Sequence, residues 1–359
     1  MKTSPQGYRI AVVGASSLLG KELLNVLEEY HFPFSRLVTF SDEENEPELP
    51  ILDLREGSKT SVLDENVTAS ELDFAFIAAR SLQMPSFLNP APASDQGRPA
   101  CFIIDLSPAT PGEKAAEAQI PFPGKVVSVP FLDRSFPLGE KEQGGESRVY
   151  VSACPATIVI SSLLLRLAAR FPLKGAVANI FTSVSEVGSR GIEELQKQTV
   201  SLLSFQKIPR KVFGAQLAFN LLSRPGGTGG SELLALENGL RKQLKEYLQG
   251  RVPLPALRLF QVPVFYSLAV SLFIETDQPV AAEKAGEALQ GERIQVRRRS
   301  QDSPTQIEVT GSDKILVDSV MADPDHPTGL WIWAVADNLR LAAVNAVEVA
   351  ESLRHRIAL

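Results

Sequence analysis

The stretch that most constrains the fold of this chain is Val149–Arg170. A β-branched run ends at Ser152, and Pro155 follows at the expected first turn of a helix. Proline suits this position because the N–H group that it lacks would have had no hydrogen-bond partner within the helix. That helix is apolar on most faces, which predicts burial between two layers. Cys154 directly precedes it, where free N–H groups and the helix dipole favour a thiolate or a bound anion. Two interpretations follow for Cys154: a nucleophile, or a small residue beside a buried helix start.

The bulk composition predicts a globular protein of two domains. The chain has 359 residues, 44% apolar and 22% charged, with a formal net charge of −6, and this length exceeds one ordinary core. No basic stripe covers a domain, which excludes a nucleic-acid partner. No segment reaches the ~20 apolar residues that span a bilayer, which excludes a membrane partner. Two cysteines suit a reducing compartment, so we expect a cytoplasmic protein.

A strand, a glycine turn and a helix open the chain. Tyr8–Val13 is the expected strand, and Gly14 and Gly20 bracket the turn, with Ser17 in the middle position. Such a βα unit places backbone N–H groups against a phosphate. The alternative is an ordinary tight βα turn without a ligand.

The end of the next expected strand bears on the choice of cofactor. Leu37–Phe40 is followed by Ser41 and by four acidic residues within 42–46. An acidic residue at this place pairs with a ribose 2′-hydroxyl, whereas a 2′-phosphate would be repelled. NAD is therefore favoured over NADP. The alternative is a charged, solvated loop, with neither cofactor bound.

Short β-rich runs separated by helical or loop segments continue through the first half. We expect strands at Phe74–Ala78, Cys101–Leu106 and Val126–Val129, which is the order of a Rossmann-like doubly wound parallel sheet in an α/β fold. Cys101 opens a strand, which predicts a buried structural thiol. The polar stretch 139–147 marks the domain boundary.

The second half predicts an α+β domain. We expect a strand at Ala176–Ser183, an amphipathic helix at Arg190–Ser204, a mobile loop at Arg224–Gly230, one long strand at Leu259–Glu275 and a final helix at Asp337–Leu353. The long strand has apolar residues at a period of two. The stripe of small residues on the final helix allows close packing.

Five motifs together resemble the aspartate-semialdehyde dehydrogenases. They are G-A-S-S-L-L-G at 14–20, C-F-I-I-D-L-S at 101–107, F-x-x-Q-L-A-F-N at 213–220, V-P-V-F-Y at 262–266 and W-A-V-A-D-N-L-R at 333–340. The resemblance implies a dinucleotide-binding domain at 1–150 to which a C-terminal helix at 336–359 returns. It also implies an α+β substrate and dimerisation domain at 151–335, and a homodimer.

The resemblance and the glycine turn together give the candidate site. The candidate catalytic residue is Cys154. The candidate cofactor-binding residues are Gly14, Ser16, Ser17, Leu18, Gly20, Ser41 and Asn338. No metal site is expected.

The residues that the family reaction requires are largely replaced. The resemblance implies a cysteine nucleophile, a histidine acid/base, NADP, and basic groups for a carboxylate and a phosphate. Alignment on Thr157 puts Pro155 at the nucleophile position. Leu268 replaces the histidine and Gln261 replaces the carboxylate-binding arginine. The phosphate-binding arginine is missing at 111, a glutamine is missing near Glu186, and a lysine is missing from the 231–240 helix.

These replacements predict a non-catalytic member of the family, similar to its Usg-like branch. Such a protein would be a dimer that holds a nucleotide or serves another protein as a partner. The alternative is an active NAD(P)-dependent oxidoreductase that uses Cys154 on an aldehyde or oxo group of an altered substrate. Between the two lies a nucleotide sensor built on Asn338 and the glycine turn.

Overall fold

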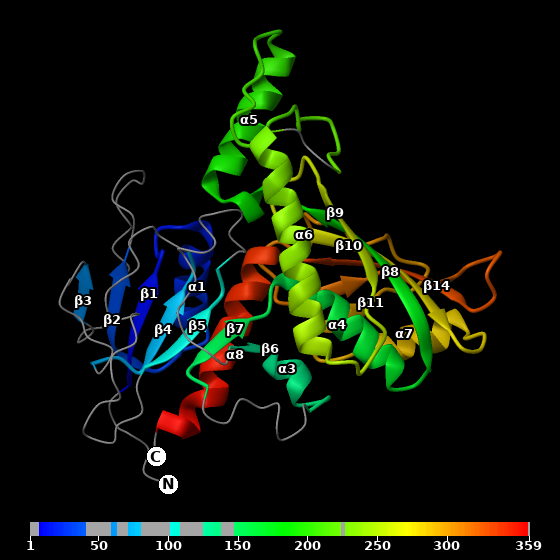
Figure 1. Cartoon of the computed structure of the whole chain (residues 1–359), viewed down its shortest axis with the longest axis horizontal. Helices are drawn as coiled ribbons and strands as arrows, with labels where there is room; N and C mark the ends of the chain where they lie inside the picture. Colours follow the sequence, from blue (N-terminus) through cyan, green and yellow to red (C-terminus); the bar gives the residue numbers. More distant parts are fainter. Residues whose placement is uncertain are drawn as a thin grey trace. The chain divides into compact units, whose positions relative to one another are not determined.

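The computed structural model divides into two compact units (Figure 1). The first comprises Met1–Ala153 and Ala342–Leu359, and the second Cys154–Leu341. The described residues are 7–40, 59–62, 71–79, 101–107, 125–137, 147–223 and 227–357, with backbone alone for 59–62 and 227–232. Ser41 with its acidic neighbours and the position of the missing arginine at 111 lie outside them.

A parallel sheet forms the first unit. Its seven described strands run in the order β3-β2-β1-β4-β5-β7-β6, and every neighbouring pair is parallel. The strands are β1 (Tyr8–Val13), β2 (Phe34–Phe40), β3 (Lys59–Val62), β4 (Phe74–Ile77), β5 (Phe102–Asp105), β6 (Val126–Ser128) and β7 (Val149–Ser152). The order reverses between β1 and β4, where ligands bind in such sheets. The Rossmann-like prediction is confirmed.

Helix α8 (Asn338–Ile357) contributes its part from Ala342 onward to this unit. The Asn345 side-chain amide donates to the Ser128 carbonyl at 3.0 Å and to Ser152 Oγ at 2.8 Å. These bonds hold the helix to the carboxyl ends of β6 and β7. The other described helices of the unit are α1 (Leu18–Glu29) and α3 (Pro130–Asp133).

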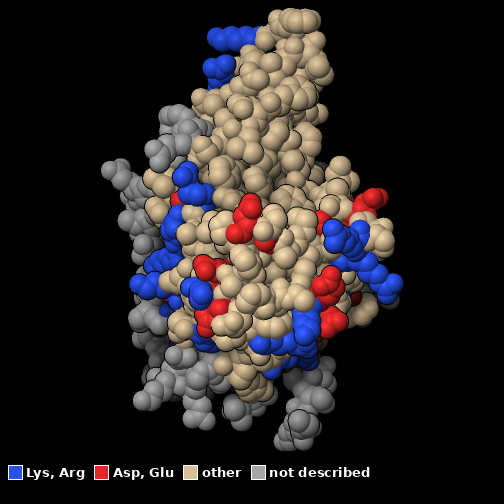
Figure 2. Space-filling model, turned by 90° about the vertical axis from the view of Figure 1, so that its right-hand side faces the viewer, with Lys and Arg blue, Asp and Glu red and all other residues tan. Residues whose placement is uncertain are grey.

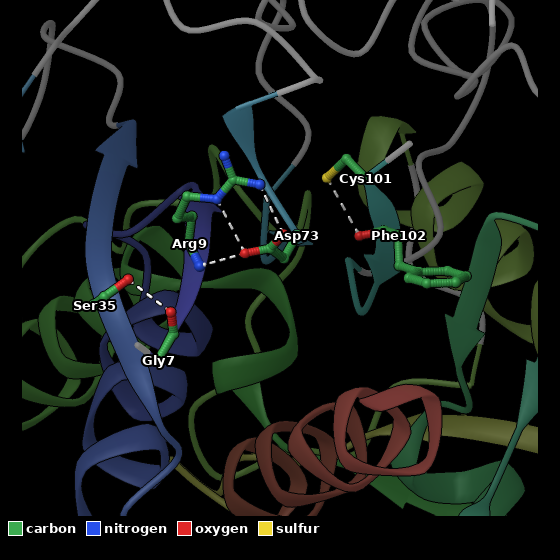
Figure 3. Close-up of polar contacts among 6 residues, drawn as sticks. All are labelled: Gly7, Arg9, Ser35, Asp73, Cys101 and Phe102. Carbon is green, nitrogen blue, oxygen red and sulfur yellow. Dashed lines mark hydrogen bonds and ion pairs between the residues drawn. The ribbon is translucent and has the colours of Figure 1, made fainter. Parts of the chain in front are cut away.

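An ion pair joins β1 to the start of β4 (Figure 3). Asp73 accepts from Arg9 Nη2 at 2.8 Å, from Arg9 Nε at 3.2 Å and from the Arg9 backbone N–H at 2.8 Å. The hydrogen bonds that Arg9 donates to Asp73 raise the pKa of Arg9 above its usual value. Cys101 lies in the same region, buried, with its Sγ donating to the Phe102 carbonyl at 3.6 Å. The structure thus confirms Cys101 as a buried thiol.

We expect Asp73→Ala to lower the free energy of unfolding by about 1–3 kcal/mol, because Arg9 and a backbone N–H lose a charged acceptor. The measurement is equilibrium denaturant unfolding. Glu71→Ala is the matched control, since its pair with Arg36 is longer, at 3.7 Å, and more exposed; it should change the free energy by less than about 0.5 kcal/mol. Equal losses in both variants would contradict the prediction.

A mixed sheet forms the second unit. Its path is β11-β12-β14-β10-β8-β9, with β13 paired to β14. The strands are β8 (Leu173–Thr182), β9 (Ala256–Gln261), β10 (Leu268–Thr276), β11 (Ile294–Val296), β12 (Ile315–Val317), β13 (Met321–Ala322) and β14 (Gly329–Ala336). The helices are α4 (Pro155–Ala168), α5 (Ser189–Leu203), α6 (Gly227–Leu248) and α7 (Ala282–Leu289). Helix α4 packs on β8, β10 and β14 and between α6 and α7, and is almost wholly buried, as predicted.

Two elements differ from the expectation. The single strand at Leu259–Glu275 is wrong: β9 ends at Gln261, β10 begins at Leu268, and they flank β8 on opposite sides. Pro263 cannot donate a ladder bond, and Ser267 takes a left-handed φ of 71°, so the strand breaks there. The loop at Arg224–Gly230 is also too long, because α6 already begins at Gly227. The later turns of α6 pack on α4 and β9, which offsets the low helix propensity of its glycines.

Candidate functional site

The turn between β1 and α1 is shaped by two glycines. Gly14 has a left-handed φ of 77°, and a Cβ there would lie 2.5 Å from Ala79 Cβ. A Cβ on Gly20 would lie 2.1 Å from the Gly14 carbonyl oxygen. Only glycine permits this close approach of strand and helix.

Ser17 caps helix α1. Its Oγ accepts from the Gly20 N–H at 3.0 Å and donates to the Gly14 carbonyl at 2.8 Å. Its φ of −63° is ordinary, so serine is tolerated at the middle position of the turn. Leu18 and Leu19 supply the first two N–H groups of the helix, and neither meets an acceptor among the described groups.

The unpaired N–H groups and the dipole at this helix start suit a pyrophosphate. The adjacent Ser16 is buried and lies in the same turn. Ser41, the candidate nearest the ribose, is outside the described residues. The described residues of the turn therefore suit the pyrophosphate of a dinucleotide.

Cys154 is the N-cap residue of α4, with Pro155 at the first helical position. Its backbone N–H donates to Gln243 Oε1 at 2.7 Å, and its Sγ lies 3.2 Å from Thr157 Oγ1. Burial raises the pKa of the thiol to about 11, the Thr157 hydroxyl lowers it, and the Glu186 carboxylate raises it further. The thiol is therefore protonated at neutral pH, unlike an activated nucleophile.

Asn338 lies in the second unit at the centre of a polar network. Its Oδ1 accepts from Ser185 Oγ at 3.1 Å and from the Ser267 N–H at 2.9 Å, and its Nδ2 donates to Glu186 Oε2 at 3.1 Å. Ser185 Oγ also lies 2.9 Å from Ser183 Oγ. Only one amide hydrogen of Asn338 remains for another partner.

Glu186 was noted in the sequence only as a residue standing where a glutamine is missing. It belongs to the 3-10 helix η4 (Val184–Val187). Burial raises the pKa of its carboxyl, and the hydrogen bond from Asn338 lowers it. Glu186 acts electrostatically on Cys154, although the two residues are 32 positions apart in the sequence. Gln243 was missed altogether, since a glutamine inside an amphipathic helix gives no signal.

Two of the positions at which family residues are replaced, those of Leu268 and Gln261, are buried and hold no free ionisable group. Leu268 is buried in β10, paired with Thr182 and Ala336. Gln261 is buried, and its Nε2 donates to the Thr182 carbonyl at 2.9 Å. His326 is exposed and bonds to Asp323 at 3.0 Å. Within the described ranges, no group of three or more His, Cys, Asp or Glu could hold a metal ion, and no helix is long and apolar enough to cross a membrane.

We expect Ser267→Gly to raise the free energy of unfolding by about 1 kcal/mol. Ser267 is fully buried at φ 71°, and its Oγ has no hydrogen-bond partner within the described residues. Glycine relieves the left-handed strain and removes the buried hydroxyl. Ser267→Ala is the control, because it removes the hydroxyl but keeps the strain. If alanine stabilises the chain as much as glycine in denaturant unfolding, backbone strain is not the cause.

Two family models match the chain in succession. Residues 9–122 match the model described as semialdehyde dehydrogenase, NAD binding domain. Residues 164–341 match the model described as semialdehyde dehydrogenase, dimerisation domain. Together they cover most of both units.

Relatives carry two names. The chain is 26% identical to the aspartate-semialdehyde dehydrogenase of Aquifex aeolicus, over 97% of this chain and 98% of the relative. It is also 26% identical to a USG-1 protein homolog of Pseudomonas aeruginosa, over 97% and 98%. The crystal structure of aspartate semialdehyde dehydrogenase II from Vibrio cholerae superposes with a TM-score of 0.76 at 24% identity, over 98% of this chain and 99% of that one.

Proposed function

Because the chain belongs to the semialdehyde dehydrogenase family, we propose a function in which the family scaffold is kept and the family reaction is not. In this proposal the chain is a homodimer that binds a dinucleotide. Residues 1–150 with 336–359 hold the nucleotide, and residues 151–335 make the dimer contact. The protein acts as a nucleotide-binding or regulatory dimer rather than as a dehydrogenase of aspartate semialdehyde.

The observation that carries the proposal is that polar side chains of the site already form hydrogen bonds with other residues of the chain. Asn338, Ser185 and Gln261 all have partners within the second unit. Leu268 fills the histidine position, so no group there can move a proton. Loss of one acid/base group costs roughly 10²–10⁴ in rate, and here the anion-binding arginines are replaced as well.

The test of inactivity is an assay of the purified protein with aspartate semialdehyde, phosphate and either NAD or NADP. We expect no turnover above background, with a family enzyme assayed in parallel as the positive control. Turnover within tenfold of that enzyme would overturn the proposal.

Nucleotide binding is tested separately by calorimetric titration with NAD and with NADP. The unpaired N–H groups of Leu18 and Leu19 support binding of the pyrophosphate, and the acidic run at 42–46 favours NAD. Leu18→Asp should abolish binding while stabilising α1 through its dipole, because α1 has no acidic residue in its first turn. Leu18→Asn is the uncharged control. If Leu18→Asp binds the nucleotide as tightly as the wild type does, the nucleotide-binding site does not lie at the glycine turn.

The position of Cys154 favours a second candidate. The thiol lies at a helix start and is only half-buried, which supports an NAD(P)-dependent oxidoreductase acting on an aldehyde or oxo group of another substrate. The reactivity of this thiol separates the two candidates.

A further inference from the structure

The carboxylate of Glu186 has a single hydrogen-bond partner in the described part of the chain. Asn338 Nδ2 donates to its Oε2 at 3.1 Å, whereas Oε1 accepts no bond from these residues. None of their lysines and arginines forms an ion pair with this carboxylate or acts on its pKa. The side chain is half-buried, and Oε1 is not among the enclosed atoms, so this oxygen reaches the surface. Glu186 thus presents a free acceptor to a ligand.

Two other carboxylates of the second unit that are largely buried are fully used by the chain. Glu194 accepts from three backbone N–H groups at 2.7–3.1 Å. Glu237 pairs with Arg241 at 2.9 Å and with Arg258 at 3.4 Å, and it accepts from a backbone N–H at 2.9 Å. A charge that is withdrawn from water without such partners is costly, and groups of this kind cluster at binding sites. Glu186 lacks the partner that the chain gives to the other two.

The described groups around Glu186 are neutral. The Cys154 thiol is protonated at neutral pH, and Glu186 is the only charged residue among those described that acts electrostatically on it. Asn338 contributes an amide, and Ser185 contributes a hydroxyl that bonds to the same amide. No cation among these groups attracts a carboxylate or a phosphate, and the ionised Glu186 repels both.

The start of α4 does not offset this charge. The Cys154 N–H donates to Gln243 Oε1 at 2.7 Å, and Pro155 has no N–H. Two of the four N–H groups that would face an anion at a helix start are therefore occupied or absent. Gln243 takes the place that an anionic ligand would need.

The charge of the surrounding surface is mixed. Figure 2 shows lysine, arginine and acidic side chains interspersed over the lower part of one face of the molecule. Such a surface gives no long-range attraction for one sign of charge. The groups that a ligand touches therefore decide the sign of charge that binds, and at this site the charged group is Glu186.

We propose that the second unit binds a small protonated amine at Glu186, beside Cys154. The ammonium group donates to Oε1, while the Asn338 amide holds Oε2 in place. This inference rests on the proposed function, in which the site does not act on aspartate semialdehyde, and it names the class of ligand that the altered site takes.

The test is a ligand-observed NMR titration of the full chain with three four-carbon probes: butylammonium, butyramide and butyrate. A hydrogen bond to a charged group contributes roughly tenfold or more in affinity. We therefore expect butylammonium to bind at least about tenfold more tightly than butyramide, and butyrate to show no binding at millimolar concentration.

Glu186→Gln keeps the size of the side chain and an acceptor oxygen but removes the charge. It should weaken butylammonium binding about tenfold or more and leave butyramide binding unchanged. Glu193→Gln is the matched control, because Glu193 is exposed and pairs with Lys197 at 3.0 Å; it should change neither affinity.

Four results would each overturn the inference: equal affinity for butylammonium and butyramide, tighter binding of butyrate, no binding of any probe, or an amine affinity that is unchanged in Glu186→Gln. Turnover of aspartate semialdehyde would refute the proposed function instead. That assay contains no amine probe, so the two failures are distinguishable.

Discussion

Replacing Gln198 by leucine should lower the free energy of unfolding by about 3–5 kcal/mol. Gln198 is fully buried in α5. Its Oε1 accepts from the Leu217 and Ala218 N–H groups at 2.7 and 3.0 Å, and its Nε2 donates to the Pro209 and Ala215 carbonyls at 2.8 and 3.0 Å. Leucine leaves these four backbone groups buried without a partner, at roughly 1–3 kcal/mol each when no water can enter. Partial opening of the segment that contains these four groups, residues 209–218, keeps the total loss of stability below the sum of the four separate losses.

The segment 209–218 has no regular strand or helix of its own, so two side chains of α5 hold it. Besides Gln198, the buried Glu194 accepts from the Lys211, Val212 and Phe213 N–H groups at 2.7–3.1 Å. Phe213 and Leu217 of this segment pack in one buried apolar cluster with Leu195 and Val184. Loss of Gln198 should therefore expose the same apolar cluster.

Two measurements check the prediction for Gln198. Denaturant unfolding gives the free energy, and hydrogen exchange gives the protection of the Leu217 and Ala218 amides, which should fall by several orders of magnitude. Gln196→Leu makes the same chemical change on the exposed side of α5 and should leave both quantities nearly unchanged. Protection that survives in Gln198→Leu would show that the segment is held by its apolar contacts.

The sequence predicted α5 itself but not this role of its polar residues. Helical periodicity places Glu194 and Gln198 four residues apart on one face, and such pairs usually face solvent. Here the face is covered by a segment that returns from later in the chain. Periodicity reports which residues share a face, and only the tertiary structure decides what covers it.

The fold of the first unit was predictable because each signal was local. Strand runs, the glycine turn and the spacing of elements specify a parallel sheet, and the strand order at β1 and β4 follows from the right-handed crossover rule. The break between β9 and β10 was not predictable from the pattern of apolar residues, because their period of two continues across it. Pro263 was the available signal, since proline inside a strand argues against one.

The candidate site was predictable in position but not in chemistry. The proline at the start of α4 placed Cys154 at the helix N-terminus, which alone would favour a thiolate. The structure adds Glu186 and burial, and both act in the opposite direction. Neither could be derived from the local sequence around Cys154.

Cys154 should react with iodoacetamide about 10–100 times more slowly at pH 7.5 than a free thiol does. With a pKa of about 11, its thiolate fraction is several hundredfold below that of a free cysteine of pKa ~8.5. The greater nucleophilicity of a more basic thiolate offsets roughly tenfold of this difference. The rate should rise about tenfold per pH unit up to pH 10, without a plateau near 8.5.

The reactivity of Cys154 is measured in a Cys101→Ala background, with Cys154→Ala as the blank. Glu186→Gln removes the carboxylate that raises the pKa of Cys154, so it should speed alkylation at pH 8 several-fold while leaving the slope of the pH profile unchanged at lower pH. Glu193→Gln, on an exposed carboxylate of α5, is the matched control and should have no effect. Rapid labelling at pH 7 that NAD slows would instead mean an activated thiol beside a bound nicotinamide. That result would favour an oxidoreductase with an altered substrate over the non-catalytic dimer.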